Sequence, residues 1–150
     1  MDMSATGRMH LKNREGVRAK AYLDSVGILT IGVGHTSMAG PPKVRRGMIL
    51  SDHEIDEVLA HDLVRYEDAV ERALKGIKLK QYEFDALVSL CFNIGEGNFA
   101  KSSVVKLIKA GNKAGAADKF LLWKKAGGRV VLGLVNRRKS ERLQFLGQLE

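Results

Sequence analysis

Cysteine is nearly absent from this sequence of 150 residues, in which Cys91 is the only one. A single cysteine cannot form a disulfide within the chain, so we expect the protein to fold in a reducing compartment. Catalysis by Cys91 would need a base beside it, and the neighbouring residues offer none. The sequence also lacks the cysteine and histidine spacing of a zinc site, and we expect neither a metal nor another cofactor.

Long apolar runs are missing as well. The N-terminal segment MDMSATGRMHLKNREG is too polar for a secretory signal or a membrane-spanning helix, so we expect no membrane anchor. Both prolines of the sequence lie in one segment, between Gly40 and Gly47, together with the basic residues Lys43, Arg45 and Arg46. This composition predicts a turn-rich loop.

Acidic residues are outnumbered, with 17 Asp and Glu against 25 Lys and Arg, which gives a formal net charge of +8. Such a charge attracts polyanions, which include cell envelopes and nucleic acids. A nucleic-acid-binding module is therefore one hypothesis. Against it, the sequence has no aromatic RNA-binding motif and no helix-turn-helix with a basic recognition face, so we expect no specific nucleic-acid partner.

Helical periodicity dominates the second part of the chain. Ser51 and Glu54 form a capping box, and apolar residues then recur at helical spacing as far as Leu74, which predicts a helix over about 51–75. Four more helices are expected at 82–94, 103–109, 113–125 and 134–146, separated by glycines. We place Trp123 in the core of these helices.

The first part of the chain has a different pattern. A short helix ends at Glu15, because Gly16 directly after it is a common stop signal. Alternation of residue types from Ala19 to Val33 then predicts a hairpin. The sequence thus predicts an α+β, mainly helical, single domain with a helix and hairpin lobe (about 1–50), a connecting helix (about 51–75) and an all-helical lobe (about 76–150).

Three chemically complementary side chains accompany this hairpin. If Gly27 lies at the centre of the turn, Asp24 is directly opposite Thr30, and the two could hold one water between them. Glu15 supplies a second carboxyl group. A glycosidase needs an acid to protonate the leaving oxygen and a base to hold the attacking water. The alternative is that both carboxylates are solvated surface charges and that Thr30 is present for its β-propensity.

The run EGVRAKAYLDSVGILTIGVGHT, which starts at Glu15, resembles the signature of the phage-type lysozymes of glycoside hydrolase family 24. The stretches FDALVSLCFNIGEGNFAKSSVVKLIKAG (84–111) and FLLWKKAGGRVVLGLVNRRKSERLQFL (120–146) are similar to those of the lambdoid-phage branch of that family. The resemblance implies a lysozyme-like fold with an active-site cleft between the two lobes.

The resemblance also implies a reaction, the hydrolysis of the β-1,4 bond between N-acetylmuramic acid and N-acetylglucosamine in peptidoglycan by an endolysin. Glu15 would protonate the glycosidic oxygen, while Asp24 and Thr30 would position the water that attacks with inversion. A lytic transglycosylase, which cleaves the same bond without water, is the alternative. It would need Glu15 but have little use for Asp24 and Thr30.

Two supporting residues are carried over from the family. Arg137, which follows Asn136, matches an arginine that approaches the catalytic glutamate, and we expect it to orient Glu15. The alternative is a solvated residue in a basic helix. His35 matches a histidine that braces the small lobe, and we expect a structural role for it.

Three further residues are candidates for substrate binding. Phe92 and Asn93 match an aromatic and amide pair that lines the cleft in the family, although Phe92 could equally be a core residue. Ser102 corresponds either to another cleft residue or to a plain helix N-cap.

The implied partners are peptidoglycan as substrate and a holin, because an enzyme without an export signal must wait for another protein to open the membrane. We expect the enzyme to reside in the host cytoplasm until that moment and then to act on the wall from the periplasm. We also expect a monomer.

Overall fold

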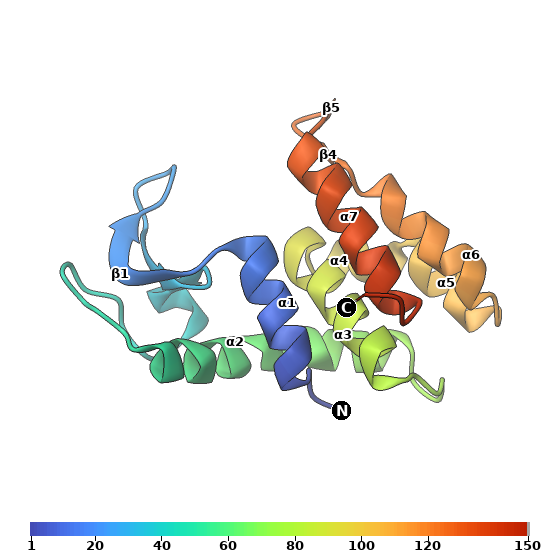
Figure 1. The fold of residues 1–150 in the computed structure, drawn as a ribbon, viewed down its shortest axis with the longest axis horizontal. Coiled ribbons are helices and arrows are strands. Elements are labelled where there is room, and N and C mark those ends of the chain that lie inside the picture. The colour runs from blue at the N-terminus through green and yellow to red at the C-terminus, as the bar shows by residue number, and fades with distance from the viewer. Residues whose placement is uncertain (150) are drawn as a thin grey trace. The chain divides into compact units, whose positions relative to one another are not determined.

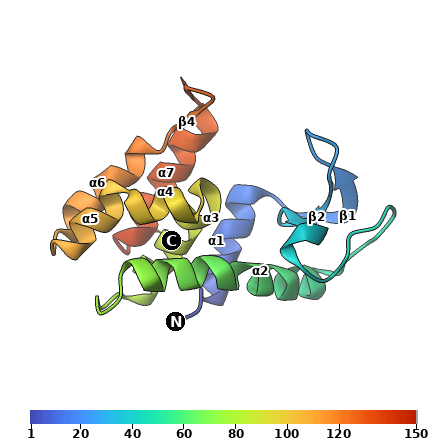
Figure 2. The ribbon, with the colours of Figure 1, turned by 180° about the vertical axis from the view of Figure 1, so that it is seen from behind.

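The computed structural model describes residues 1–149. Figures 1 and 2 show its helices and strands from opposite sides. The chain divides into two compact units: unit 2 contains Arg8–Val64, and unit 1 contains Met1–Gly7 and the residues from Arg65 onward. Two helices, α1 (Ala5–Glu15) and α2 (Asp52–Ala73), cross the division, so each contributes residues to both units.

Unit 2 is built on a three-stranded antiparallel sheet in the order β1–β2–β3. The strands are β1 (Arg18–Leu23), β2 (Leu29–Gly32) and β3 (His35–Thr36), and a short 3-10 helix, η1 (Ser37–Ala39), follows. A Cβ placed on Gly32 would lie 3.7 Å from Ile55 Cγ2, so the end of β2 packs against the first turns of α2. Ile31, Val33 and Ile55 are buried there.

The start of α2 confirms the predicted capping box. Ser51 Oγ accepts a hydrogen bond from the Glu54 N–H (3.1 Å), and Glu54 Oε1 accepts one from the Ser51 N–H (2.9 Å). Two N–H groups that the helix leaves without partners are thereby satisfied.

The register of the β1–β2 hairpin differs from the predicted one. Tyr22, rather than Asp24, pairs with Thr30, and Leu23 pairs with Leu29. The Asp24 N–H donates to Ile28 O (3.0 Å), so the turn is centred on Val26 and not on Gly27. The shift is an even number of residues and therefore leaves Asp24 on the same face as Thr30, as a diagonal neighbour instead of a direct partner.

A second segment covers the other edge of β1. The Ala21 N–H donates to Met48 O (2.9 Å), the Leu50 N–H donates to Ala19 O (2.9 Å), and Lys20 lies opposite Ile49. Figure 1 shows this segment running beside β1 before α2 begins. The loop predicted for residues 40–47 therefore returns the chain to the sheet.

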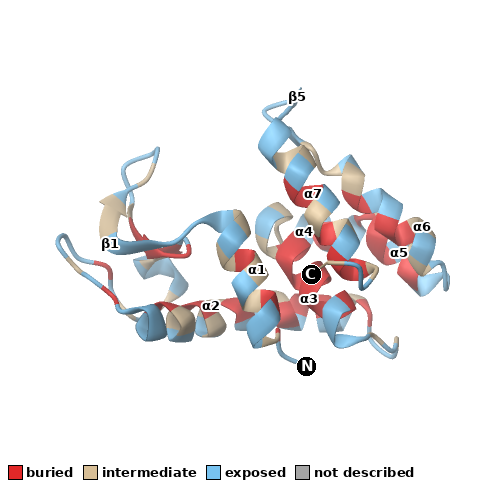
Figure 3. Ribbon diagram, viewed as in Figure 1, coloured by how far each residue is buried: buried red, intermediate tan, exposed pale blue. Residues whose placement is uncertain are grey.

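Unit 1 is organised around α3 (Gln81–Ile94), which is buried along most of its length (Figure 3). The C-terminal helix α7 (Leu132–Phe145) packs on α3. The remaining helices of this unit are α4 (Glu96–Lys101), α5 (Ser103–Lys109), α6 (Lys113–Lys119) and the 3-10 helix η2 (Phe120–Leu122). Phe120 and Phe145 meet in the core with ring centroids 5.4 Å apart.

Unit 1 also contains a small hairpin, which corrects the prediction of an all-helical lobe. Strands β4 (Lys125–Ala126) and β5 (Arg129–Val130) pair antiparallel. The turn residues Gly127 and Gly128 both have positive φ, at 58° and 78°, as a type I′ turn requires. The helix predicted over 113–125 accordingly ends at Lys119, and η2 and β4 take its last turns.

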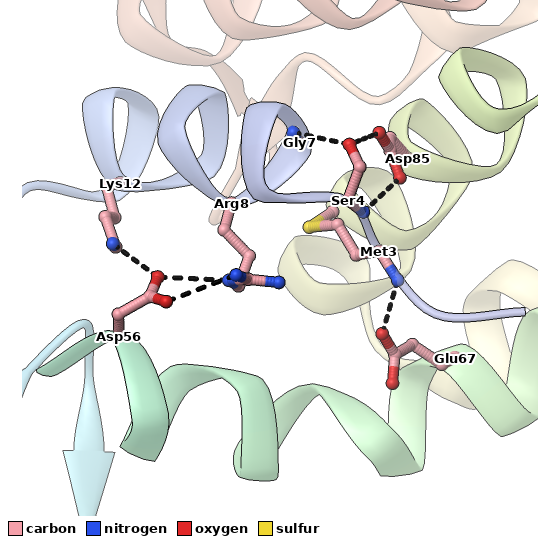
Figure 4. Close-up of polar contacts among 8 residues, drawn as sticks. All are labelled: Met3, Ser4, Gly7, Arg8, Lys12, Asp56, Glu67 and Asp85. Atoms are coloured by element: carbon pink, nitrogen blue, oxygen red, sulfur yellow. Dashed lines mark hydrogen bonds and ion pairs between the residues drawn. The ribbon is translucent and has the colours of Figure 1, made fainter. Parts of the chain in front are cut away.

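Carboxylates of α2 and α3 fasten the N-terminal residues within unit 1 (Figure 4). The Met3 N–H donates to Glu67 Oε2 (2.6 Å), and the Ser4 N–H donates to Asp85 Oδ1 (3.0 Å). Ser4 Oγ in turn accepts from the Gly7 N–H (3.0 Å) and so caps α1. Burial raises the pKa of Glu67.

The prediction of a mainly helical α+β fold with a small hairpin region and a long helix over about 51–75 is confirmed. Across the described residues, no helix is both long enough and apolar enough to cross a membrane.

Candidate active site

Glu15 is the last residue of α1, as the sequence predicted. The Gly16 N–H donates to Lys12 O (2.8 Å), and Gly16 has a φ of 80°, a conformation that favours glycine directly after a helix. The Glu15 side chain is exposed. The end of α1 therefore presents a carboxyl group at the surface of unit 2.

Asp56 of α2 holds the part of α1 that leads to Glu15 (Figure 4). It accepts hydrogen bonds from Arg8 Nε (3.0 Å), from Arg8 Nη2 (3.2 Å) and from Lys12 Nζ (2.6 Å). These bonds from Arg8 and Lys12 lower the pKa of Asp56. Arg8 and Lys12 are four residues apart on one helix face, so a single carboxylate fixes one side of α1.

Glu15 lines a pocket of about 350 Å³ in unit 2, together with Gly16, Val17, Arg18, Tyr22 and Gly34. The Arg18 guanidinium lies over the Tyr22 ring, with Cζ 4.4 Å from the ring centroid. This cation–π contact fixes the direction of the guanidinium beside the pocket. The wall thus combines a carboxyl group, a cation and an aromatic ring.

Asp24 lies in the turn between β1 and β2 and is partly buried. Its Oδ1 accepts from the Val26 N–H (3.0 Å) and from the Ile28 N–H (2.8 Å). These bonds fold the turn and hold the carboxylate in a fixed direction. They involve Oδ1 only, so Oδ2 takes no part in the turn.

Thr30 is buried at 4% exposure, and its Oγ1 donates to Ile28 O (2.9 Å). The backbone of Ile28 is therefore bonded to Asp24 through its N–H and to Thr30 through its carbonyl. The two side chains of the predicted water-holding pair are oriented by one residue. The hydroxyl proton of Thr30 is used in this bond, which leaves its oxygen as an acceptor for another donor.

His35 has a structural position in unit 2, consistent with the role expected for it. Its ring is 1% exposed, with Nδ1 2.6 Å from Asp62 Oδ2 and Nε2 2.9 Å from Pro42 O. Both partners are oxygen atoms that accept hydrogen bonds. The histidine joins β3, the proline segment and α2. Among the described residues, no group of three or more His, Cys, Asp or Glu could hold a metal ion.

Arg137 and Arg138 form a buried charged cluster in unit 1 around Glu141, which is fully buried. Arg137 Nε donates to Glu141 Oε2 (3.2 Å), Arg138 Nη1 donates to Glu141 Oε1, and Ser89 Oγ donates to Glu141 Oε2 (2.5 Å). Arg137 is thus not the solvated residue of the alternative interpretation. Its predicted action on Glu15 stays a prediction.

Asn93 belongs to a second pocket, of about 330 Å³, in unit 1. Its Oδ1 accepts from Arg138 Nη2, and Trp123 and Lys125 line the same pocket. Trp123 is only partly buried, so its predicted place in the core was wrong. The Gly127–Gly128 pair was the feature of the sequence that could have predicted this. It forms the turn of the β4–β5 hairpin, and Trp123 lies just before the first strand of that hairpin.

The remaining two candidates have local partners. The Phe92 ring packs edge-on against Tyr66, with centroids 5.1 Å apart, and is partly exposed. Ser102 is buried and caps α5, because its Oγ accepts from the Val105 N–H (3.2 Å) and donates to Phe99 O (2.7 Å). The helix-cap interpretation of Ser102 is confirmed, and its contact with substrate stays a prediction.

A mainly helical chain thus carries one carboxyl group at the end of α1, and a second carboxyl group and an oriented hydroxyl at the neighbouring β1–β2 hairpin, which are the groups that a glycoside hydrolase of the lysozyme type uses. Residues 12–141 match the phage lysozyme family. The chain belongs to this family and is a lysozyme, a glycoside hydrolase that cleaves peptidoglycan.

Among its relatives, the endolysin of Salmonella phage P22 is 45% identical over 97% of this chain and 99% of its own length. The endolysin of Bacillus phage B103 is 37% identical over 97% of this chain, which spans only 54% of that longer protein.

Solved structures agree with these matches. A crystal structure of a P22 lysozyme mutant has a TM-score of 0.90 at 45% identity, and covers 97% of this chain and 99% of that one. The muramidase domain of SpmX from Asticaccaulis excentricus has a TM-score of 0.84 at 34% identity, over 96% of this chain and 97% of that domain.

Proposed function

We propose that this lysozyme is an endolysin that hydrolyses the β-1,4 bond between N-acetylmuramic acid and N-acetylglucosamine with inversion. The observation that carries the proposal is the attachment of Asp24 and Thr30 to opposite ends of the same Ile28 backbone, in the unit that also presents Glu15. An inverting glycosidase needs one carboxylic acid and a separate carboxylate that activates a water. The three side chains match these two tasks.

In this mechanism Glu15 is the general acid. It donates its proton to the glycosidic oxygen as the bond to the anomeric carbon breaks, and the leaving sugar departs with a hydroxyl group. The exposed position of Glu15 in the 350 Å³ pocket is compatible with access by a sugar chain. We expect Arg137 to orient the acid, and Phe92, Asn93 and Ser102 to contribute to sugar binding.

Asp24 and Thr30 act on the water. Asp24 Oδ2 accepts one proton of the water while the Thr30 oxygen accepts the other, so the water lone pair points to the anomeric carbon from the face opposite the leaving group. The turn bonds to Asp24 Oδ1 keep this geometry fixed before substrate arrives.

The cellular role proposed with this activity is host lysis late in phage growth. We propose that the enzyme waits in the host cytoplasm as a monomer, and that a holin opens the membrane and admits it to the wall. The family membership and the endolysin relatives support this role.

Isotope labelling tests the proposed chemistry. Purified peptidoglycan is digested in water enriched in oxygen-18, and the fragments are analysed by mass spectrometry. Hydrolysis gives reducing N-acetylmuramic acid ends that carry the label, and inversion gives the α-anomer first in NMR spectra recorded within minutes. Unlabelled anhydro ends would instead establish a lytic transglycosylase, and a β-anomer would exclude inversion.

A further inference from the structure

A basic surface on unit 2 has no role in the mechanism described above. The sequence contains no Asp or Glu between Asp24 and Asp52, although this interval includes the strands β2 and β3 and the segment that returns to β1. The side chains of four basic residues near this interval are exposed, and together we call them the basic edge: Lys20, Lys43, Arg45 and Arg46.

The fold gathers these four residues along one edge of the sheet. Lys20 is on β1, directly opposite Ile49 of the returning segment. The Met48 N–H donates to Arg45 O (3.1 Å), so Arg45 and Arg46 form the turn that leads into this pairing. Lys43 lies two residues before Arg45. Arg18, two residues before Lys20 on the same strand, lines the pocket of Glu15.

The cations of the basic edge have no counter-charge in the described part of the chain. Several other basic residues are paired: Arg8 and Lys12 with Asp56, Arg65 with Glu96, and Arg142 with Asp118. No salt bridge to a carboxylate involves the four residues of the basic edge within residues 1–149. Like charges that lie near one another without a counter-ion repel, and an anionic ligand relieves this repulsion.

We propose that the basic edge binds carboxylates of the peptide stems of peptidoglycan. This inference rests on the proposed function. The sugars of the substrate are neutral N-acetyl sugars, so the anionic groups near the cleavage site are the stem carboxylates. Guanidinium groups such as those of Arg45 and Arg46 bind carboxylates in a bidentate manner. The basic edge therefore holds neighbouring stems while the glycan lies at Glu15.

A triple variant, K43Q/R45Q/R46Q, tests the inference against a matched control, K101Q/K106Q/K109Q. The control residues are also exposed and unpaired in the described structure, and lie on α4 and α5 of unit 1. Each variant removes three positive charges, which lowers the formal net charge from +8 to +5. Long-range attraction to the wall is thus reduced to a similar extent in both variants. The two variants differ only in where the lost charges lay.

Each protein is assayed on native sacculi and on sacculi whose carboxylates have been converted to amides with a carbodiimide and ammonium. We expect the basic-edge variant to show about a tenfold higher KM on native sacculi with kcat unchanged, since three exposed ion pairs are lost. On amidated sacculi it should equal the wild type, because the wild type has lost the same contacts. The control should show a much smaller rise in KM on native sacculi, from the loss of long-range attraction alone, and no rise on amidated sacculi.

Three results would overturn the proposal. An equal rise in KM for both triple variants would show that net charge alone matters. Unchanged KM in the basic-edge variant would remove the edge from substrate binding. Loss of binding to phosphatidylglycerol vesicles or duplex DNA, with sacculus binding intact, would assign the edge to another polyanion.

Binding is also measured by sedimentation with sacculi in the inactive E15Q background, so the comparison does not depend on turnover. If the wild type releases no labelled reducing ends, the proposed function fails. The dissociation constants of the triple variants for native and amidated sacculi still decide the role of the basic edge.

Discussion

The two units of this lysozyme use charged side chains in opposite ways. In unit 1, Arg137, Arg138 and Glu141 are buried and satisfy one another. In unit 2, Glu15 is exposed, Asp24 is bonded only to its own turn, and the basic edge has no acidic partner among the described residues. Charged groups that form ion pairs with one another stabilise the fold. A carboxylate held only by backbone N–H groups, such as Asp24, and the cations of the basic edge can still bind a ligand. This difference predicts which substitutions alter activity and which alter stability.

The largest expected effect on activity is at Glu15. Replacing it with Gln keeps the size and polarity of the side chain but removes the transferable proton, so we expect the rate of muropeptide release to fall by about 10²–10⁴-fold. Because Glu15 is exposed at the end of α1, thermal unfolding should hardly change. Activity of E15Q within a factor of two of wild type would remove Glu15 from catalysis.

The largest expected effect on stability is at Glu141, in the opposite unit. A Gln at this position leaves two buried guanidinium groups without a carboxylate, which costs about 3–5 kcal/mol. We expect urea or thermal unfolding to show this loss. The matched control is Asp118→Asn, which breaks the exposed ion pair with Arg142. It should cost less than about 1 kcal/mol.

Equal losses of stability in these two variants would break the comparison between the units. The burial of Glu141 would then contribute nothing beyond an ordinary surface ion pair.

Some features of the β1–β2 hairpin could be predicted from the sequence and others could not. The end of α1 at Glu15 and the presence of two strands followed from Gly16 and from alternation, because both are local properties. The pairing of Asp24 with Thr30 was wrong, because the turn closes through Asp24 Oδ1 and the Ile28 N–H. A side-chain bond of this kind favours a turn centred on Val26 over one centred on Gly27. The pattern of residue types does not show which of the two turns is more stable.

The contacts within the charged cluster of unit 1 could not be predicted from the sequence, for a different reason. Arg137 was singled out only through resemblance to a family. Ser89, which is hydrogen-bonded to both Arg137 and Glu141, lies 48 residues before Arg137 and 52 residues before Glu141 in the chain. Buried polar contacts over such separations depend on how α3 packs against α7. Helical periodicity identifies each helix but does not fix which polar side chains meet.

A smaller effect on activity is expected for the water-holding pair. Asp24→Asn retains an oxygen that can accept the Val26 and Ile28 N–H bonds, so the turn should persist while the base is lost. We expect a fall in kcat of about 10²-fold with KM unchanged, which is the lower end of what general base catalysis contributes. Thr30→Val, which removes the hydroxyl, should act in the same direction, and Thr30→Ser should restore activity.

These variants also separate the two candidate mechanisms. Near-normal release of fragments by both Asp24→Asn and Thr30→Val would contradict hydrolysis by a held water. It would favour a transglycosylase that depends on Glu15.

The smallest expected effect on stability is at Asp56. This residue tests the comparison between the units because it forms ion pairs within unit 2, with Arg8 and Lys12. Arg8 and Lys12 hold the pKa of Asp56 below the usual value of an aspartate, so this carboxylate stabilises the folded state above its unfolded pKa. The contribution is lost as the pH falls through the folded pKa. Because Asp56 is about a third exposed (34%), solvent screening limits the contribution to about 1 kcal/mol or less.

The Asp56→Asn variant should therefore have a lower free energy of unfolding than the wild type at neutral pH. Measured from neutral to acidic pH, the two curves of stability against pH should meet at low pH. The Asp56 carboxylate holds α1 and not the reacting atoms, so KM and kcat should change by less than about threefold at neutral pH. A constant gap between the two stability curves at every pH would mean that packing, and not the charge of Asp56, holds this side of α1. A large fall in kcat would instead show that the direction of α1 decides how Glu15 meets the sugar, and charge pairing in unit 2 would then serve catalysis as directly as Glu15 and Asp24 do.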